Sequence, residues 1–172
     1  MKGLITGSIA GLLFALALRQ LSWLEVPLEV THLPALLTYL IVVRGFGETL
    51  AVRAVTGPLA RNLPARDAAR TALSVALGFG IGLAADPLLA GFWAERPFRA
   101  AVVVLLRPLV AAQWAAAFAR GEPTARPLAV AGWRGGLLAI LDRETGFATL
   151  VEVLLAAELA RLAWRELRAL PA

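Results

Sequence analysis

The chain has 172 residues, of which 59% are hydrophobic and 17% are charged, and its mean hydropathy is +0.74. Because a soluble domain carries about 25% charged residues, this composition excludes an ordinary soluble domain and predicts an all-α, polytopic membrane protein with one helical domain over residues 1–172. The absence of cysteine and the single histidine exclude disulfides, thiolate metal sites and a multi-histidine metal or haem site within one chain.

Basic residues outnumber acidic ones by 17 to 12, and the isoelectric point is about 11.2. This balance does not indicate a nucleic-acid partner, because the arginines flank apolar segments singly or in pairs and form no long basic run. Arginines placed in this way hold loops on the cytoplasmic side of a membrane. We therefore expect a multi-pass membrane protein whose basic loops face the cytoplasm, with the lipid bilayer as its surroundings.

The first predicted segment is Gly3–Leu24. We do not interpret it as a signal peptide, because its apolar run continues past Arg19 and lacks a small-x-small cleavage site. Gly3, Gly7 and Gly11 recur every four residues, which lines one helix face with small residues and lets another helix approach closely. We expect this face to be a packed interface, either within the chain or between copies of it.

The second predicted segment, Pro34–Val55, follows a short external connection over Glu25–Leu33 that contains no lysine or arginine. Arg44 and Glu48 are four residues apart on one face of this segment, and this part of the helix is too polar to face lipid. The stretch Arg53–Arg70 is the most basic of the first half of the chain. We expect it to form a cytoplasmic loop that is broken by its two prolines.

The next two segments, Thr71–Ala94 and Phe98–Arg120, are predicted to fold back on each other as an antiparallel hairpin. Each is about long enough to cross a hydrocarbon core of ~30 Å as a helix. Asp86 and Arg107 are each about ten residues from the turn, which places them level with each other at roughly 15 Å from it. An unpaired charge at this depth costs several kcal/mol, so we expect either a structural ion pair or part of an ion or proton path.

Small residues and prolines also mark this hairpin. Ser74, Gly78 and Gly82 repeat every four residues and lead to the acidic residue of the third segment, so we expect a second smooth face for helix packing. A proline directly follows each of the two charged residues. Because proline removes a backbone hydrogen bond, both helices are expected to kink at this level.

The hairpin carries one family resemblance. The run from Gly78 to Asp86, followed by the run from Arg99 to Arg107, resembles the uncharacterised bacterial membrane protein family DUF1622. The resemblance covers about a third of the chain, over residues 70–122. The sequence departs from the family pattern at Gly80, where the family has a glutamate, and at the proline after Asp86, where it has an isoleucine. The resemblance implies a membrane hairpin and no particular chemistry.

The last part of the chain leaves the number of crossings open. Leu128–Leu141 is short and contains an arginine and two glycines, so it crosses as a short helix, enters and returns, or lies in the interface. Phe147–Trp164 is predicted to be a helix whose charged end emerges into the cytoplasm. The basic stretches share one side only if Leu128–Leu141 crosses. We therefore favour six transmembrane segments with both termini cytoplasmic, over four or five segments plus interfacial or re-entrant helices.

A layer of ionisable residues at similar inferred depth is the candidate functional feature: Arg44, Glu48, Asp86, Arg107 and Glu152. Their charges nearly cancel, which suits a buried network. No catalytic, cofactor or metal motif accompanies them, so we do not expect an enzyme. The layer predicts an ion or proton transporter or an oligomeric channel. The alternative is a non-catalytic structural or accessory subunit that docks in a larger membrane complex through its charges and glycine faces.

Overall fold

The computed structural model describes residues 1–31, 33–86, 97–141 and 147–170, and all regular secondary structure in these residues is helical. The prediction of an all-α chain is therefore confirmed. The elements in chain order are α1 (Lys2–Thr31), α2 (Leu33–Tyr39), the π-helix η1 (Leu40–Gly47), α3 (Glu48–Ala60), α4 (Ala65–Ala84), α6 (Pro97–Ala119), α7 (Ala125–Leu141) and α8 (Phe147–Arg168).

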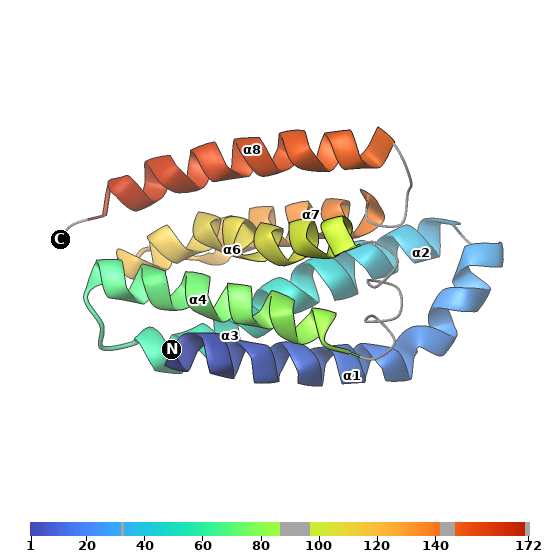
Figure 1. Ribbon diagram of the computed structural model, residues 1–172, viewed down its shortest axis with the longest axis horizontal. Helices are drawn as coiled ribbons and strands as arrows, with labels where there is room; N and C mark the ends of the chain where they lie inside the picture. The colour runs from blue at the N-terminus through green and yellow to red at the C-terminus, as the bar shows by residue number, and fades with distance from the viewer. Residues whose placement is uncertain (32, 87–96, 142–146, 171–172) are drawn as a thin grey trace.

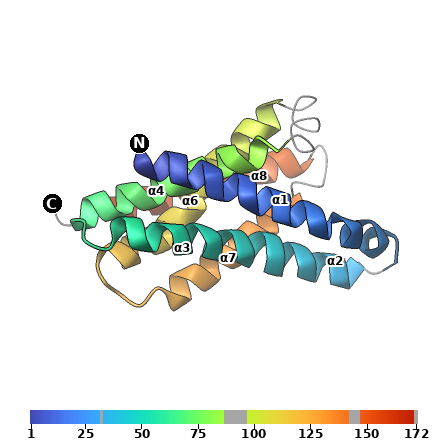
Figure 2. The same ribbon diagram turned by 90° about the horizontal axis from the view of Figure 1, so that it is seen from below.

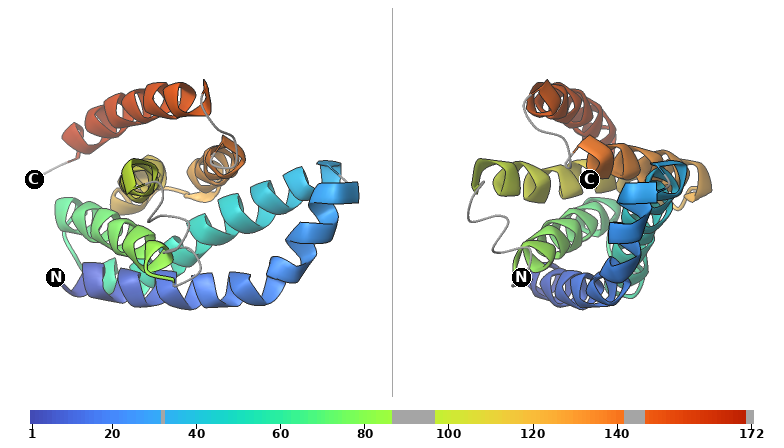
Figure 3. Two further views of the ribbon diagram at one scale, coloured as in Figure 1. Left: turned by 45° about the vertical axis from the view of Figure 1, so that its right-hand side comes forward. Right: turned by 90° about the vertical axis from the view of Figure 1, so that its right-hand side faces the viewer.

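The helices are stacked in layers along the long axis of the molecule (Figure 1). The views from below and from the side show that α1 runs alongside α3 and α4, and that α6 and α7 cross this layer at an angle (Figures 2 and 3). The last helix, α8, lies outermost and packs on α6. Both termini and the α3–α4 and α6–α7 connections lie at the same end of the molecule (Figure 1).

The core is built around α6, which packs against α4 and against α8. Its largest fully buried apolar side chains are Val75 and Phe79 of α4, Trp114 of α6 and Leu159 of α8. Much of the remaining core surface comes from alanines, whose small side chains let the helices approach closely. The core therefore depends on the fit between helix backbones as well as on large apolar side chains.

The first two helical segments differ from the prediction at their ends. The expected loop over Glu25–Leu33 is instead helical through Thr31, because α1 continues and bends in its second half, which contains Pro27 (Figure 3). The second segment also ends later than predicted, because its helix continues beyond Val55. Pro58 lies in the last turn of α3 and leaves the helix intact to Ala60, since it removes one backbone hydrogen bond only.

The third segment is shorter than predicted, because α4 ends at Ala84 and not at Ala94. Proline disfavours a helical conformation in the residue before it, so Pro87 ends the helix where a kink was expected. Asp86 consequently follows the helix. The predicted turn lies within 87–96, outside the described residues. Pro108 lies inside α6, and the predicted kink of this helix stays a prediction.

One described helical stretch, Lys2–Gln20, is long and apolar enough to cross a membrane by itself, with 19 residues and a mean hydropathy of 1.4. A shorter apolar stretch, Val104–Ala119, occupies most of α6. The region predicted as Leu128–Leu141 is helical throughout and forms most of α7. The other described helices have charges in or near their apolar parts, which lowers their hydropathy.

Candidate functional site: a buried charge cluster

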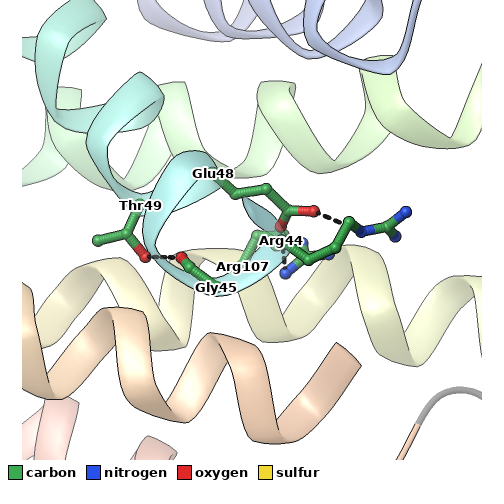
Figure 4. Close-up of polar contacts among 5 residues, drawn as sticks. All are labelled: Arg44, Gly45, Glu48, Thr49 and Arg107. Atoms are coloured by element: carbon green, nitrogen blue, oxygen red, sulfur yellow. Dashed lines mark hydrogen bonds and ion pairs between the residues drawn. The ribbon is translucent and has the colours of Figure 1, made fainter. Parts of the chain in front are cut away.

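Glu48 lies at the junction between η1 and α3, and the whole residue is only 3% exposed. The π-helix before it is a rare form that recurs at functional sites. Arg44 belongs to this π-helix, and its Nε atom lies 3.3 Å from Oε1 of Glu48. The hydroxyl of Thr49 donates a hydrogen bond of 2.8 Å to the carbonyl oxygen of Gly45, which satisfies a backbone acceptor in the same turn (Figure 4).

Arg107 of α6 approaches the same carboxylate from the other side. Its Nη1 atom lies 2.6 Å from Oε2 of Glu48, and its side chain is 11% exposed. Glu48 therefore lies between two guanidinium groups that come from different elements (Figure 4). We call Arg44, Glu48 and Arg107 the Glu48 cluster. The cluster contains two arginines and one glutamate, so its formal net charge is positive.

The expected pairing of Arg107 with Asp86 is wrong in the part of the chain that the structure describes. Arg107 pairs with Glu48, whereas Asp86 is buried and makes an interaction elsewhere. Asp86 and Arg107 would lie level with each other only if the third segment stayed helical beyond Asp86, but α4 ends two residues before it. Gly80 of α4 instead lies against the stem of Arg107, since a Cβ atom there would be 3.1 Å from Cγ of Arg107.

The hydrogen bonding of the Glu48 cluster is incomplete. Its charged atoms are close, but their angles are not those of hydrogen bonds. Both carboxylate oxygens of Glu48 and the Nε atoms of Arg44 and Arg107 have no hydrogen-bond partner among the described residues. A cavity of about 20 Å³ adjoins the cluster, with Phe79 and Trp114 among its apolar walls. A water molecule needs roughly 10–15 Å³, so the cavity has room for one water or a similarly small ion.

A close contact between η1 and α7 holds Arg44 and Glu48 in place. A Cβ atom at Gly45 would overlap the carbonyl oxygen of Gly132 and would lie 2.5 Å from the backbone nitrogen of Gly136. Only glycine fits such a backbone approach. Gly132 and Gly136 were not predicted to be packing residues, although they have the same spacing of four as the residues of the two predicted glycine faces.

The two predicted glycine faces lie against each other in the α1–α4 contact. A Cβ atom at Gly7 or Gly11 of α1 would overlap a backbone carbonyl oxygen of α4, and the same holds in reverse for Gly78 and Gly82 of α4. The contacts follow the same order along both helices, so α1 and α4 run parallel (Figure 1). The approach is looser at the start of the contact, where a Cβ atom at Gly3 would be 3.4 Å from Cβ of Ser74.

The predicted charged layer is therefore only partly assembled in the described residues. Arg44, Glu48 and Arg107 form one cluster, and Asp86 is buried but forms no ion pair with these three residues. The backbone of Glu152 belongs to α8, while its side chain lies outside the described part of the structure. The chemistry available at the site is that of fixed buried charges beside a water-sized cavity.

Comparison with protein-family models, with curated proteins and with solved structures finds no match to this chain. The resemblance of residues 70–122 to the bacterial membrane family therefore stays a prediction.

Proposed function

We propose that this chain is a multi-pass protein of the bacterial cytoplasmic membrane that moves an ion or protons, as a small transporter or an oligomeric channel, with the Glu48 cluster on the path. One observation carries the proposal: a carboxylate buried between two guanidinium groups has open hydrogen-bonding capacity beside a water-sized cavity. Buried polar groups are normally satisfied, so an unsatisfied group calls for an explanation. Water or an ion passing through the cavity would supply the missing partners.

The distribution of charge supports a membrane orientation. The end of the molecule with both termini comprises residues 1–2, 61–70, 120–126 and 161–172, and these stretches contain nine basic and three acidic residues. The sequence stretches that connect the opposite helix ends, 25–33, 85–96 and 142–146, contain six acidic and two basic residues. Basic residues are retained on the cytoplasmic side. This asymmetry favours cytoplasmic termini and an even number of crossings, six by our count of predicted segments.

The outer surface of the helices is also suited to lipid. Large apolar side chains are exposed on several helices, and a contiguous apolar exterior is rare in water-soluble monomers. Examples on α1 and on four other elements, η1, α3, α6 and α8, are Ile5, Ile9, Leu13, Leu16, Val42, Leu50, Leu105 and Leu154. Lipid or partner helices would cover these side chains.

Reporter fusions test the orientation. Fusions after Arg61 and after Arg126 are expected to report the cytoplasm, and a fusion after Glu29 is expected to report the external side. An external signal at Arg61 would contradict the proposed topology, whatever the transport assays show.

Ion flux into proteoliposomes tests the role of the Glu48 cluster. Wild-type protein is expected to carry a flux of protons, cations or anions that Glu48→Gln abolishes, because glutamine keeps the volume of the side chain and removes its charge. The matched control is Glu122→Gln, which removes an exposed carboxylate far along the chain from the cluster. Wild-type flux from folded Glu48→Gln protein would contradict the proposal.

A structural or accessory role in a larger membrane complex is the second candidate. The observation that favours it is the small size of the cavity, about 20 Å³, in a contact where helix backbones already touch. In this case the charges would hold the bundle together and conduct nothing. Purified wild-type protein in its native oligomeric state would then give no flux for any ion, and Glu48→Gln would change stability alone.

A further inference from the structure

An open cleft of about 780 Å³ lies at the end of the molecule that carries both termini. It is formed by the last turns of α3, the α3–α4 connection and the α6–α7 connection. Its volume is within the range of ligand pockets, roughly 300–1,000 Å³. We call it the Arg53 cleft, and the residues used below are Arg53, Arg61, Phe118, Glu122 and Thr124.

Arg53 is a half-buried cation in this cleft, and the described residues supply no carboxylate to pair with it. Its guanidinium carbon lies 4.2 Å from the centre of the Phe118 ring and 5.9 Å from that of Trp114, so the group is held over aromatic faces. Its Nε atom is buried without a hydrogen-bond partner, and no carboxylate of the described residues forms an ion pair with it. Partly burying a charge is costly unless it is paired, so the arrangement lacks a counter-charge.

Glu122 is the acidic residue that lines the cleft, but it is already engaged. Both of its carboxylate oxygens accept hydrogen bonds from Arg120, from Nε at 2.6 Å and from Nη2 at 3.0 Å. A bidentate pair of this kind is among the stronger side-chain interactions. Glu122 is therefore occupied by Arg120, and the charge of Arg53 remains available to an anion from outside the chain.

Two further features of the cleft favour an anion. Arg61 is exposed at its edge and adds a second positive charge. The first turn of α7 begins at the cleft wall, where the backbone N–H of Leu128 bonds to the carbonyl of Thr124 at 2.9 Å. The free N–H groups at a helix start carry a partial positive charge and attract anions. Arg61 and the start of α7 strengthen the attraction for an anion, but Arg53 is its main source.

We propose that the Arg53 cleft binds a phosphate group, with Arg53 as the fixed contact and Arg61 as the outer one. Guanidinium groups match the geometry of phosphate oxygens and can bind them through two parallel hydrogen bonds. The phosphate could belong to the headgroup of an anionic lipid or be free in solution. Basic pockets between helices at the cytoplasmic surface bind such headgroups. This inference does not depend on ion transport by the Glu48 cluster.

Thermal unfolding of the full-length protein in detergent tests the site. The probes are inorganic phosphate, phosphatidylcholine, and phosphatidylcholine mixed with an equal amount of phosphatidylglycerol. Phosphate or the anionic lipid mixture is expected to raise the Tm of the wild type, and Arg53→Gln is expected to weaken the apparent affinity about tenfold or more. Arg61→Gln should weaken it less. The matched control is Arg126→Gln, an exposed arginine at the same end that does not line the cleft.

The comparison of inorganic phosphate with phosphatidylglycerol identifies the source of the phosphate. A response to phosphatidylglycerol alone supports a lipid headgroup, and a response to inorganic phosphate supports a free anion. An equal loss of apparent affinity in Arg126→Gln and Arg53→Gln would overturn the proposal, because the general positive charge of the surface would then explain the binding. The absence of any response in the wild type would also overturn it. If Arg53→Gln does not fold, Arg61→Gln decides the question, because its side chain is exposed.

Discussion

Two carboxylate–arginine pairs of this protein have the same shortest distance and opposite surroundings. Nη1 of Arg107 lies 2.6 Å from Glu48, and Nε of Arg120 lies 2.6 Å from Glu122. The side chain of Glu48 is 4% exposed and accepts no hydrogen bond from the described residues, whereas that of Glu122 is 49% exposed and accepts two. The exposed Arg120–Glu122 pair thus has the better hydrogen-bond geometry, although water screens its charges. The distance alone therefore does not show which of the two pairs contributes more to stability.

The buried pair is the one that calls for a reason other than stability. Replacing a buried ion pair with apolar side chains of similar volume is often neutral or stabilising, whereas removing one partner is strongly destabilising. A chain that needed only a packed bundle could have used leucines at Glu48 and Arg107. The retained charges are therefore consistent with the ion-handling role proposed above, and the exposed pair provides an internal reference for testing it.

The largest effect is expected for Glu48→Ala. It leaves two guanidinium groups buried without their counter-charge, which costs about 3–5 kcal/mol of the free energy of unfolding. Glu122→Ala should have little effect, because its pair is at the surface. Unfolding in mixed micelles measures both variants. Similar losses for the two variants would remove the distinction between the buried and the exposed pair.

The second largest loss of stability is expected in the uncharged contact between α1 and α4. Gly11→Ala introduces a Cβ atom that overlaps the carbonyl oxygen of Phe79, and forcing a packed contact apart costs about 1–3 kcal/mol. Gly3→Ala is the matched control, since its Cβ atom would meet Ser74 at an ordinary distance of 3.4 Å. The same unfolding assay compares them. Equal stability of the two variants would mean that the helices separate without cost.

A double-mutant cycle then locates the partner of Arg107. Arg107→Leu and Glu48→Leu are expected to be coupled by about 0.5–3 kcal/mol, because the residues contact each other, and the double variant should recover much of the stability that either single variant loses. Arg107→Leu combined with Asp86→Asn should be close to additive. Strong coupling to Asp86 and none to Glu48 would restore the level hairpin that the sequence predicted.

Much of the helical pattern could be predicted because it is local. Apolar runs located the helices, and a spacing of four identified the Gly7–Gly11 and Gly78–Gly82 faces that meet in the α1–α4 contact. The same spacing linked Arg44 with Glu48, which do form a pair. These features depend on the period of the helix, so the sequence contains them directly.

The features that were missed depend on tertiary structure or on competing local rules. The partner of Arg107 comes from a helix much earlier in the chain, and no local spacing indicates it. Pro87 follows a run with three glycines, and we predicted a kink at the place where the helix ends. The position of Arg53 over Phe118 likewise arises only when α3 and α6 pack together.

The smallest effect is a pH dependence at the exposed pair. The hydrogen bond from Arg120 lowers the pKa of Glu122, its positive charge also lowers it, and partial desolvation opposes both. The folded protein therefore holds this carboxylate in its charged form more firmly than the unfolded chain, in which the pKa has its ordinary value of 4.5.

The stabilisation by this pair is present above pH 4.5 and is lost as the pH falls through the lower pKa of the folded state. Wild-type protein should thus lose slightly more Tm than Glu122→Gln when the pH is lowered below 4.5. Parallel curves of Tm against pH for the two proteins would show that the exposed pair contributes nothing measurable to stability. The contrast between the two pairs would then depend on the effect of Glu48 alone.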